Sequence, residues 1–319
     1  MKTSIFLLIA ACVTASLSLQ AKTLVLSHAM SLDSAAHQGM VIFADKVQQK
    51  SYGELTVEIK ANSEFGYGRK LAEHVINGNL DIAKINGSLA EAFEPNYTAL
   101  SLPFLFRNTA HMRSFIRSEV AQEILHSSSG KGFIGLTFYD SGSRSFYSTE
   151  PITSPDDLHG KKIRVPESPT MLQMVEAFNA EPVLMPLPKV YDSLEQGLID
   201  VAENDISTLV EMQHADLTKF YSTNQHTMSP DVLIISESTW NKLSKVEQRI
   251  LKQAASDSLD EEIKIWNRLE IKNIANARNQ GVTFIRSDKQ AFRNKVKPLF
   301  DEAMKDENIA YYVEKINNL

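Results

Sequence analysis

KKIRVP, residues 161–166, lies between the turn DDLHG (156–160) and a predicted helix at about residues 170–178. Ile163, Arg164 and Val165 have the character of a short buried strand, which Pro166 ends because proline cannot donate to a sheet ladder. An arginine is rarely fully buried unless it is paired. Arg164 therefore has either a carboxylate partner within the fold or an external anion, and the motif alone leaves both alternatives open.

The beginning of the chain has the pattern of a secretory signal peptide. An uncharged run covers residues 5–19, and Ala21 is the small residue that cleavage requires. The run is too short to span a membrane comfortably. Cys12, at the end of IAAC, resembles a lipoprotein processing site, but it follows an apolar region of only about seven residues. We therefore favour cleavage near Ala21 over lipid anchoring and expect a soluble periplasmic protein.

Composition excludes several classes of function. Cys12 is the only cysteine, so the mature chain would have no disulfide and no cysteine metal site. The 33 basic and 39 acidic residues give a formal charge of -6, and no basic run favours nucleic acid as a partner. A length of 319 residues is typical of about two domains.

Hydrophobic periodicity predicts an α/β chain in which one pattern occurs twice. The first occurrence has strands at 24–26, 55–59, 81–85 and 133–139 and helices at 34–49, 69–76 and 111–125. The second has strands at 162–165, 183–185 and 199–202 and helices at 170–178 and 190–196.

Two short segments indicate that the two occurrences are built alike. HVINGNLDIA (74–83) and DSLEQGLIDVA (192–202) each contain a helix end, a capping glycine, an aliphatic residue, an aspartate and the start of a strand. Ligands of open α/β sheets bind beyond the carboxyl ends of the strands. Asn86 and Asn204 lie at these ends, which predicts two domains facing each other across a cleft.

A long helix completes the predicted architecture. Ser244 and Glu247 fit a capping box, and an apolar stripe continues from there to Gly281. About 35 residues would make a helix of about 50 Å, which is longer than one small domain. We expect it to cross both domains, followed by a strand at 282–285 and helices at 288–305 and 311–317. The predicted division is a signal peptide at 1–21, a first domain of 22–141 plus 230–269, and a second domain of 142–229 plus 270–319.

The sequence shows no catalytic or metal-binding pattern. It has no G-x-S-x-G, H-E-x-x-H or P-loop motif, and its eight histidines lack metal-ligand spacing. We therefore expect no enzyme activity, cofactor or metal. Among the histidines, His28 and His226 lie at strand ends or in loops and are better site candidates than those on predicted helices.

Several motifs together resemble one family. They are PFLF (103–106), SGSR (141–144), DLHGKKIRVP (157–166), PLPKVYDSLEQGLIDVAEND (186–205), a QH pair at 225–226 and IISESTWNKLS (234–244). In this order they resemble the solute receptors of TRAP (tripartite ATP-independent periplasmic) transporters, and the resemblance covers essentially the whole mature chain. It implies a two-domain, periplasmic-binding-protein-like (class II) α/β fold with mixed sheets, a central ligand cleft and a long helix spanning both domains. We expect a monomer that delivers a small carboxylate ligand to the large and small membrane subunits of a TRAP permease.

The resemblance also implies roles for three residues. Arg164 would make a two-pronged salt bridge to the ligand carboxylate, for which the planar guanidinium fork is better suited than lysine. Arg144 would be a second cationic contact, and Asn204 would orient the carboxylate or a hydroxyl. Two alternatives remain: Arg144 could pair with Glu203 or Asp205, and Asn204 could cap the strand end.

The remaining candidates concern the identity of the acid. His28 stands where sialic-acid receptors carry asparagine, and Asn86 where they carry glutamate, so a sialic acid is disfavoured. FYSTNQHTMSPD (220–231) is similar to receptors for sugar acids such as uronates and aldonates. The candidates for contacts to hydroxyls are Glu64, His28, Asn86 and His226, and those for stacking on a ring are Phe65, Tyr67 and Tyr191. The alternatives are a C4-dicarboxylate or 2-oxo acid receptor of the same family, a ligand sensor for a signalling receptor, and an exported hydrolase.

Overall fold

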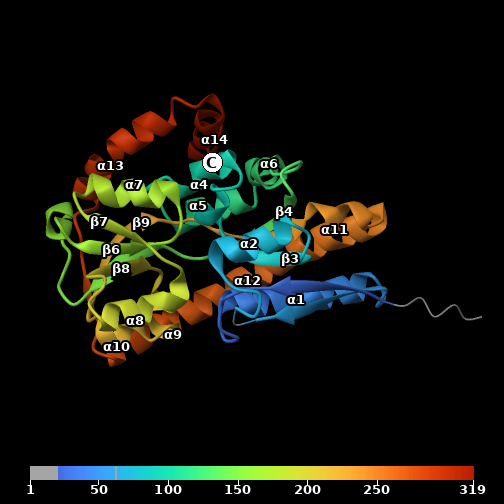
Figure 1. Cartoon of the computed structure of the whole chain (residues 1–319), viewed down its shortest axis with the longest axis horizontal. Helices are drawn as coiled ribbons and strands as arrows, with labels where there is room; N and C mark the ends of the chain where they lie inside the picture. The colour runs from blue at the N-terminus through green and yellow to red at the C-terminus, as the bar shows by residue number, and fades with distance from the viewer. Residues whose placement is uncertain (1–20, 62) are drawn as a thin grey trace, which may run out of the picture.

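The computed structural model describes residues 21–61 and 63–319, which form two α/β halves side by side (Figure 1). We call the half that contains a five-stranded sheet the first half and the half that contains a six-stranded sheet the second half. The predicted α/β class is confirmed. The predicted signal peptide and the lipidation candidate Cys12 lie outside the described residues.

The sheet of the first half has the strand order β2-β1-β3-β10-β4. Its strands are β1 (Lys22–Ser27), β2 (Leu55–Lys60), β3 (Ile82–Asn86), β4 (Phe133–Tyr139) and β10 (Asp231–Ser236). β1 is parallel to both β2 and β3, whereas β10 is antiparallel to β3 and β4. A strand from late in the chain is thus inserted into a sheet built from its beginning. The helices of this half are α1 (Ala35–Lys50), α2 (Gly68–Ile76), α3 (Gly87–Ala90), η1 (Pro95–Tyr97), α4 (Thr98–Ser101), α5 (Thr109–Ile116), α6 (Glu119–Ser127) and α11 (Glu237–Lys242).

The sheet of the second half has the order β11-β9-β5-β8-β6-β7 and is also mixed. Its strands are β5 (Arg144–Ser148), β6 (Lys162–Val165), β7 (Glu181–Leu184), β8 (Val201–Asn204), β9 (Phe220–Thr227) and β11 (Thr283–Ile285). β6 is parallel to β7 and β8, and β5 is antiparallel to β8 and β9. The helices are η2 (Pro155–Leu158), α7 (Pro169–Ala177), η3 (Leu187–Lys189), α8 (Val190–Glu195), α9 (Ile206–Glu211), α10 (His214–Leu217) and α13 (Lys289–Ala303).

The repeated segment occupies equivalent places in the two halves. Gly78 follows α2 with a φ of 73°, and Gly197 follows α8 with a φ of 67°. Both glycines adopt the left-handed conformation in which a side chain is strained, and each leads into a strand of the sheet. The strands that follow are β3 and β8, which end at Asn86 and Asn204.

Helix α12 (Lys245–Asn279) joins the halves, as its length predicted. The hydroxyl of Ser244 accepts from the backbone N–H of Glu247 at 3.2 Å, and the Glu247 carboxylate accepts from the N–H of Ser244 at 2.6 Å. This is the predicted capping box. Figure 1 shows α12 running from one half to the other. Early in the helix Leu251 lies in the core of the first half, and near its end Ala277 lies in the core of the second.

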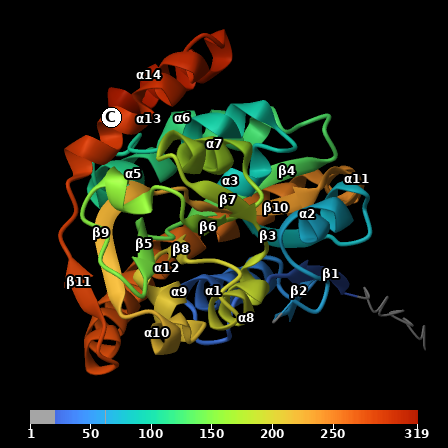
Figure 2. The same cartoon turned by 60° about the vertical axis from the view of Figure 1, so that its left-hand side comes forward.

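The last helix, α14 (Glu307–Asn317), returns to the first half. Its residues Ile309, Val313 and Ile316 belong to the core of that half, and Figure 2 shows the helix beside α6. The predicted division had assigned residues 270–319 to the second domain. The domain boundaries remain a proposal, and α14 is the segment whose packing departs from them.

One predicted helix was wrong. The pattern at 111–125 predicted a single helix, but the chain forms α5 and α6 with a break at Arg117 and Ser118. The hydroxyl of Ser118 accepts from the N–H of Ala121 at 3.2 Å and starts the second helix. The local cap therefore overrides a continuous apolar stripe.

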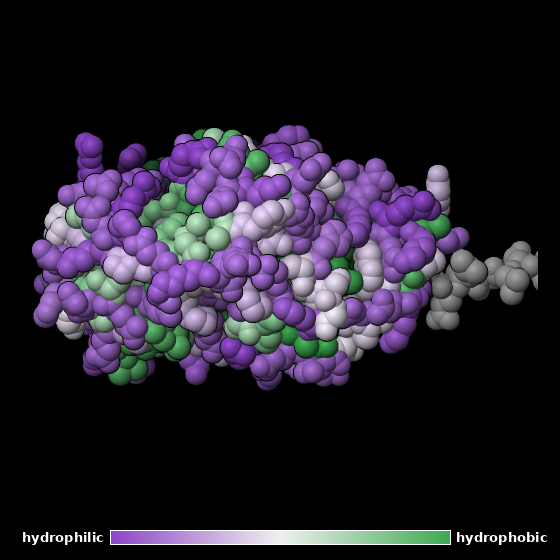
Figure 3. Space-filling view, turned by 90° about the horizontal axis from the view of Figure 1, so that it is seen from above, coloured by the Kyte–Doolittle hydropathy of each residue, from purple (hydrophilic) through white to green (hydrophobic). Residues whose placement is uncertain are grey.

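The face of the molecule shown in Figure 3 is mostly hydrophilic. Hydrophilic side chains cover most of this face, and apolar residues form separate patches. Within residues 21–61 and 63–319, the helices are too short or too polar to cross a membrane.

Candidate functional site

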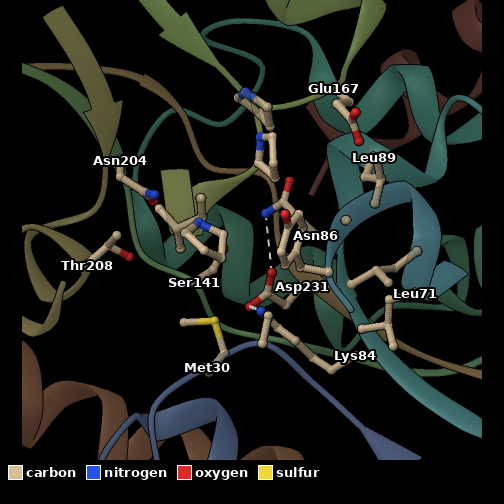
Figure 4. A pocket seen from close by; sticks show the side chains of 18 of the residues that line it. Met30, Leu71, Lys84, Asn86, Leu89, Ser141, Glu167, Asn204, Thr208 and Asp231 are labelled. Carbon is tan, nitrogen blue, oxygen red and sulfur yellow. Dashed lines mark hydrogen bonds and ion pairs between the residues drawn. The ribbon is translucent and has the colours of Figure 1, made fainter. Parts of the chain in front are cut away.

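A cavity of about 140 Å³ lies where the two halves meet. The first half contributes Met30, Leu71, Lys84, Asn86 and Asp231 among others, and the second contributes Asn204 and Thr208 (Figure 4). Arg144 and Arg164 of the second half also line the cavity, as does Ser141, on the connection between β4 and β5. Asn86 and Asn204, at the ends of β3 and β8, both line it, as expected for a site beyond the carboxyl ends of strands. The volume is below the roughly 300 to 1,000 Å³ of pockets for drug-sized ligands, so a small molecule would fill it.

Arg144 is paired within the protein. Its Nε lies 2.7 Å from Oε2 of Glu203, its Nη2 lies 2.7 Å from Oε1 of the same carboxylate, and its Nη1 donates to Oδ1 of Asn204 at 2.8 Å. Burial would raise the pKa of Glu203, but the charge of Arg144 and the hydrogen bonds from His226 and Arg144 outweigh it and lower the pKa to about 2. Of the two alternatives for Arg144, the structure shows the internal ion pair, with Glu203 as the partner.

Arg164 has no such partner. Its Nε donates to the carbonyl oxygen of Met185 at 2.9 Å, and its Nη1 is buried without a hydrogen-bond partner among residues 21–61 and 63–319. The nearest Glu203 oxygen lies 3.9 Å from Nη1, too far for a hydrogen bond. Burial lowers the pKa of Arg164 to about 10, which still leaves the guanidinium charged at neutral pH. An anion entering the cavity would supply the missing acceptor.

Asn204 is held in one orientation by its neighbours. Its Oδ1 accepts from Arg144 and from the backbone N–H of Asp205, the latter at 3.0 Å. These bonds use the carbonyl oxygen, and within the described chain the amide nitrogen is left to donate to a ligand. Asn204 can therefore cap the end of β8 with its carbonyl oxygen and still present its amide nitrogen to the cavity.

The first half contributes a polar cluster of which the sequence predicted only Asn86. Nζ of Lys84 lies 2.5 Å from Oδ2 of Asp231, and the amide of Asn86 donates to Oδ1 of Asp231 at 3.2 Å (Figure 4). Lys84 is 8% and Asp231 5% exposed. For Lys84, the signal in the sequence was a lysine among the apolar residues of the strand IAKIN.

Two predicted histidines lie behind the cavity wall rather than on it. His28 is fully buried, with Nε2 3.0 Å from Nδ1 of His37, and its Nδ1 accepts from the N–H of Met30. His226 is also fully buried, and its Nε2 lies 3.2 Å from Oε2 of Glu203. Burial lowers the pKa of both rings, that of His28 to about 3. They support Met30 and Glu203 instead of lining the cavity.

Of the remaining candidates, only Tyr67 lines the cavity. Glu64 lies beside Lys60, with 3.9 Å between their charged atoms, on a more exposed part of the surface. Phe65 packs edge-on against the ring of His74 and against the core of the first half. Tyr191 lies on α8 and is not among the cavity residues.

Comparison with known proteins identifies relatives of the whole chain. The profile of the DctP proteins, described as "bacterial extracellular solute-binding protein, family 7", matches residues 26–307. The uncharacterized protein YiiZ of Salmonella typhimurium is 36% identical, with 80% of this chain and 79% of that protein covered. The 2,3-diketo-L-gulonate-binding periplasmic protein YiaO of Escherichia coli is 28% identical, with 89% and 88% covered.

A solved structure gives the same result for the fold. The TRAP periplasmic solute-binding protein of Bradyrhizobium, crystallised with α/β-D-galacturonate, superposes with a TM-score of 0.92. It is 32% identical, and the alignment covers 93% of this chain and all of that one. At this similarity the two chains share both halves and their arrangement.

Proposed function

Because the chain belongs to the DctP family, the bacterial extracellular solute-binding proteins of family 7, we propose that its central cavity holds a small sugar acid by the carboxylate. The chain is a solute-binding protein of the TRAP type. Its family and its structural neighbours are transport proteins. The observation that carries the proposal for the ligand is the buried guanidinium of Arg164, whose Nη1 lacks an acceptor among the described residues.

The chemistry of the cavity supports a hydroxylated acid. The Arg164 fork can take both oxygens of a carboxylate, while Asn204 offers an amide donor. On the other side, Asn86 and Asp231 offer polar groups to hydroxyls. The galacturonate of the Bradyrhizobium structure and the diketogulonate in the name of YiaO are acids of this kind.

The route of the ligand is part of the same proposal. The family is extracytoplasmic, and we propose that residues 1–21 are a signal peptide that directs the chain to the periplasm. There the protein would act as a monomer whose halves close around the acid and deliver it to the two membrane subunits of a permease. Closure follows binding only if the closed form makes more contacts with the ligand than the open form, and a site built from both halves provides that difference.

Isothermal titration calorimetry on the mature protein tests the proposal. We expect D-galacturonate, D-glucuronate or D-gluconate to bind with a dissociation constant near about 1 μM, which corresponds to about -8 kcal/mol. Arg164→Ala should weaken binding by about 3 to 5 kcal/mol, because the ligand carboxylate would be left unpaired in a buried place. Arg164→Lys should also bind poorly, since it replaces a fork by a point charge.

Two controls make the result decisive. Arg268→Ala, on the exposed face of α12, should bind as the wild type does. Succinate and pyruvate represent the alternative ligand classes of the family. Tighter binding of either than of every sugar acid, or an Arg164→Ala protein within a few fold of wild type, would refute the proposed function.

A further inference from the structure

The ion pair of Lys84 and Asp231 lines one end of the cavity. This end belongs to the first half, whereas Arg164 belongs to the second. Nζ and Oδ2 are 2.5 Å apart, and Asn86 donates to the second oxygen of the same carboxylate. Asn86 is itself fixed, because its Oδ1 accepts from the N–H of Ser88 at 3.0 Å and starts α3. Both charged side chains are about 7% exposed, so their charges act at short range with little screening by water.

Two of the three cations that line the cavity are held by a carboxylate at hydrogen-bond distance. Arg144 is matched by Glu203, and Lys84 is matched by Asp231. Arg164 is the cation left over among the described residues that line the cavity.

The other titratable groups of the lining are acidic. Asp205 uses both oxygens to bond Thr208 at the start of α9, and Glu167 accepts from the N–H of Arg69 at 3.4 Å. Neither offers a positive charge to a ligand. The cavity can therefore neutralise one carboxylate, at Arg164, and a second would meet no free cation.

We propose that the Lys84–Asp231 pair makes the first-half end of the cavity a neutral, hydroxyl-binding end, which selects sugar acids with one carboxylate over aldarates, which carry one at each end. This inference rests on the proposed function. A sugar hydroxyl can donate to Asp231 and accept from Lys84 at once, so both partners stay satisfied. A carboxylate at that place would gain Lys84 only by displacing or repelling Asp231, and repulsion against the wrong ligand is a common source of specificity.

The inference predicts opposite effects for the two members of the pair. The ligands are matched couples with the same hydroxyl pattern, D-galacturonate with galactarate and D-gluconate with D-glucarate. The measured quantity is the ratio of aldarate affinity to monocarboxylate affinity in calorimetric titrations. Asp231→Asn should raise this ratio about tenfold or more, because Lys84 becomes free to take the second carboxylate. Lys84→Gln should instead lower this ratio below the wild-type value, because Asp231 then repels the second carboxylate.

A double variant separates charge from shape. Lys84→Gln with Asp231→Asn has no net charge at this end, so its ratio should return to near the wild-type value even if both affinities fall. Asp301→Asn and Lys297→Gln, an exposed ion pair on α13, make the same chemical changes outside the cavity and should leave the ratio unchanged. Thermal unfolding of each variant shows whether the single changes fold.

The outcomes decide the inference independently of the proposed function. A wild-type protein that binds an aldarate as tightly as the matched monocarboxylate, or single variants that shift the ratio in the same direction, would overturn it. If the single variants do not fold, the wild-type ratio and the double variant still decide. If the wild type prefers an unhydroxylated acid, the proposed sugar-acid function fails, and the ratio of succinate to butyrate affinity then shows whether one carboxylate is still preferred.

Discussion

Two buried arginines face the same cavity, and their surroundings give them different roles. Arg144 makes a bidentate ion pair with Glu203, so its charge is neutralised within the protein. Arg164 has one backbone acceptor, Met185, and an unpaired Nη1 within the described chain. Glu203 lies 3.9 Å from Arg164, which is too far for a hydrogen bond, so burial of this charge costs free energy in the empty protein and an entering anion would offset that cost.

Substitution of the two arginines by methionine should therefore separate stability from binding. Arg144→Met leaves Glu203 buried and unpaired, and we expect the free energy of unfolding to fall by about 3 to 5 kcal/mol. Arg164→Met should leave the stability of the ligand-free protein unchanged or raise it, while binding is lost. Urea unfolding without ligand, together with calorimetry, measures both quantities. Equal destabilisation by the two changes would contradict the assignment.

The sequence predicted the part of the site that short motifs carry. Arg164, Arg144, Asn204, Asn86 and Tyr67 all line the cavity. Lys84 and Asp231 were missed because they meet only when β10 pairs with β3, and no local pattern reveals that pairing. His28 and His226 stand at strand ends, but successive side chains of a strand point to opposite faces, and a one-residue shift decides between cavity and core.

At the scale of elements, α9 connects the site to both halves. It begins at the Asp205 cap beside the cavity and ends at Glu211. The Glu211 carboxylate accepts from Asn273 of α12 at 3.3 Å and from the hydroxyl of Ser31, in the first half, at 3.4 Å. Burial and then the charge of Asp205 raise the pKa of Glu211 to about 7.

This raised pKa predicts a stability that depends on pH. The folded protein holds the Glu211 proton up to about pH 7, whereas the unfolded chain releases it near the ordinary pKa of 4.5. The contribution to the free energy of unfolding is therefore complete below about pH 4.5 and is lost as the pH rises towards 7. Glu211→Gln mimics the protonated form, so its stability relative to wild type should rise over this range.

Urea unfolding at about pH 4.5, 6 and 8 measures this difference. Glu314→Gln, on an exposed position of α14, serves as the control and should show no such trend. A constant difference between Glu211→Gln and wild type at all three pH values would show that the carboxyl does not titrate in this range.

Elements were predictable where their signals are local. The Ser244–Glu247 capping box and the two helix-ending glycines, Gly78 and Gly197, can each be recognised from a few neighbouring residues. The order of strands in each sheet is not, because β10 and β11 join sheets whose other strands come from earlier in the chain. Such pairings depend on contacts between residues far apart in sequence.

At the scale of the whole molecule, Glu91 connects the two halves at a place outside the lining of the cavity. It follows α3 in the first half, and its carboxylate accepts from the N–H of Thr170 at 3.1 Å and from the hydroxyl of Thr170 at 2.8 Å. The hydroxyl of Ser168 donates to the same group. A residue of the first half thus caps α7 of the second half, the helix that follows the Arg164 strand.

Loss of this contact should weaken binding without touching the ligand. Glu91→Ala leaves the N–H of Thr170 without its acceptor in the arrangement seen here, which costs about 1 to 3 kcal/mol. We expect ligand affinity to fall correspondingly, and small-angle scattering to show a smaller decrease in radius of gyration on ligand addition. Glu73→Ala, an exposed change on α2, is the control. Unchanged affinity in Glu91→Ala would show that the contact does not depend on closure.

The path of the chain has a consequence for how such proteins can diversify. The core of the first half draws on three separate parts of the sequence, since it includes Phe138, Ile234 in β10 and Val313 in α14. A single recombination point between relatives therefore cannot exchange one half intact. A crossover between β3 and β10 would take Lys84 from one parent and Asp231 from the other, so the pair at the first-half end of the cavity is kept only where both parents carry it.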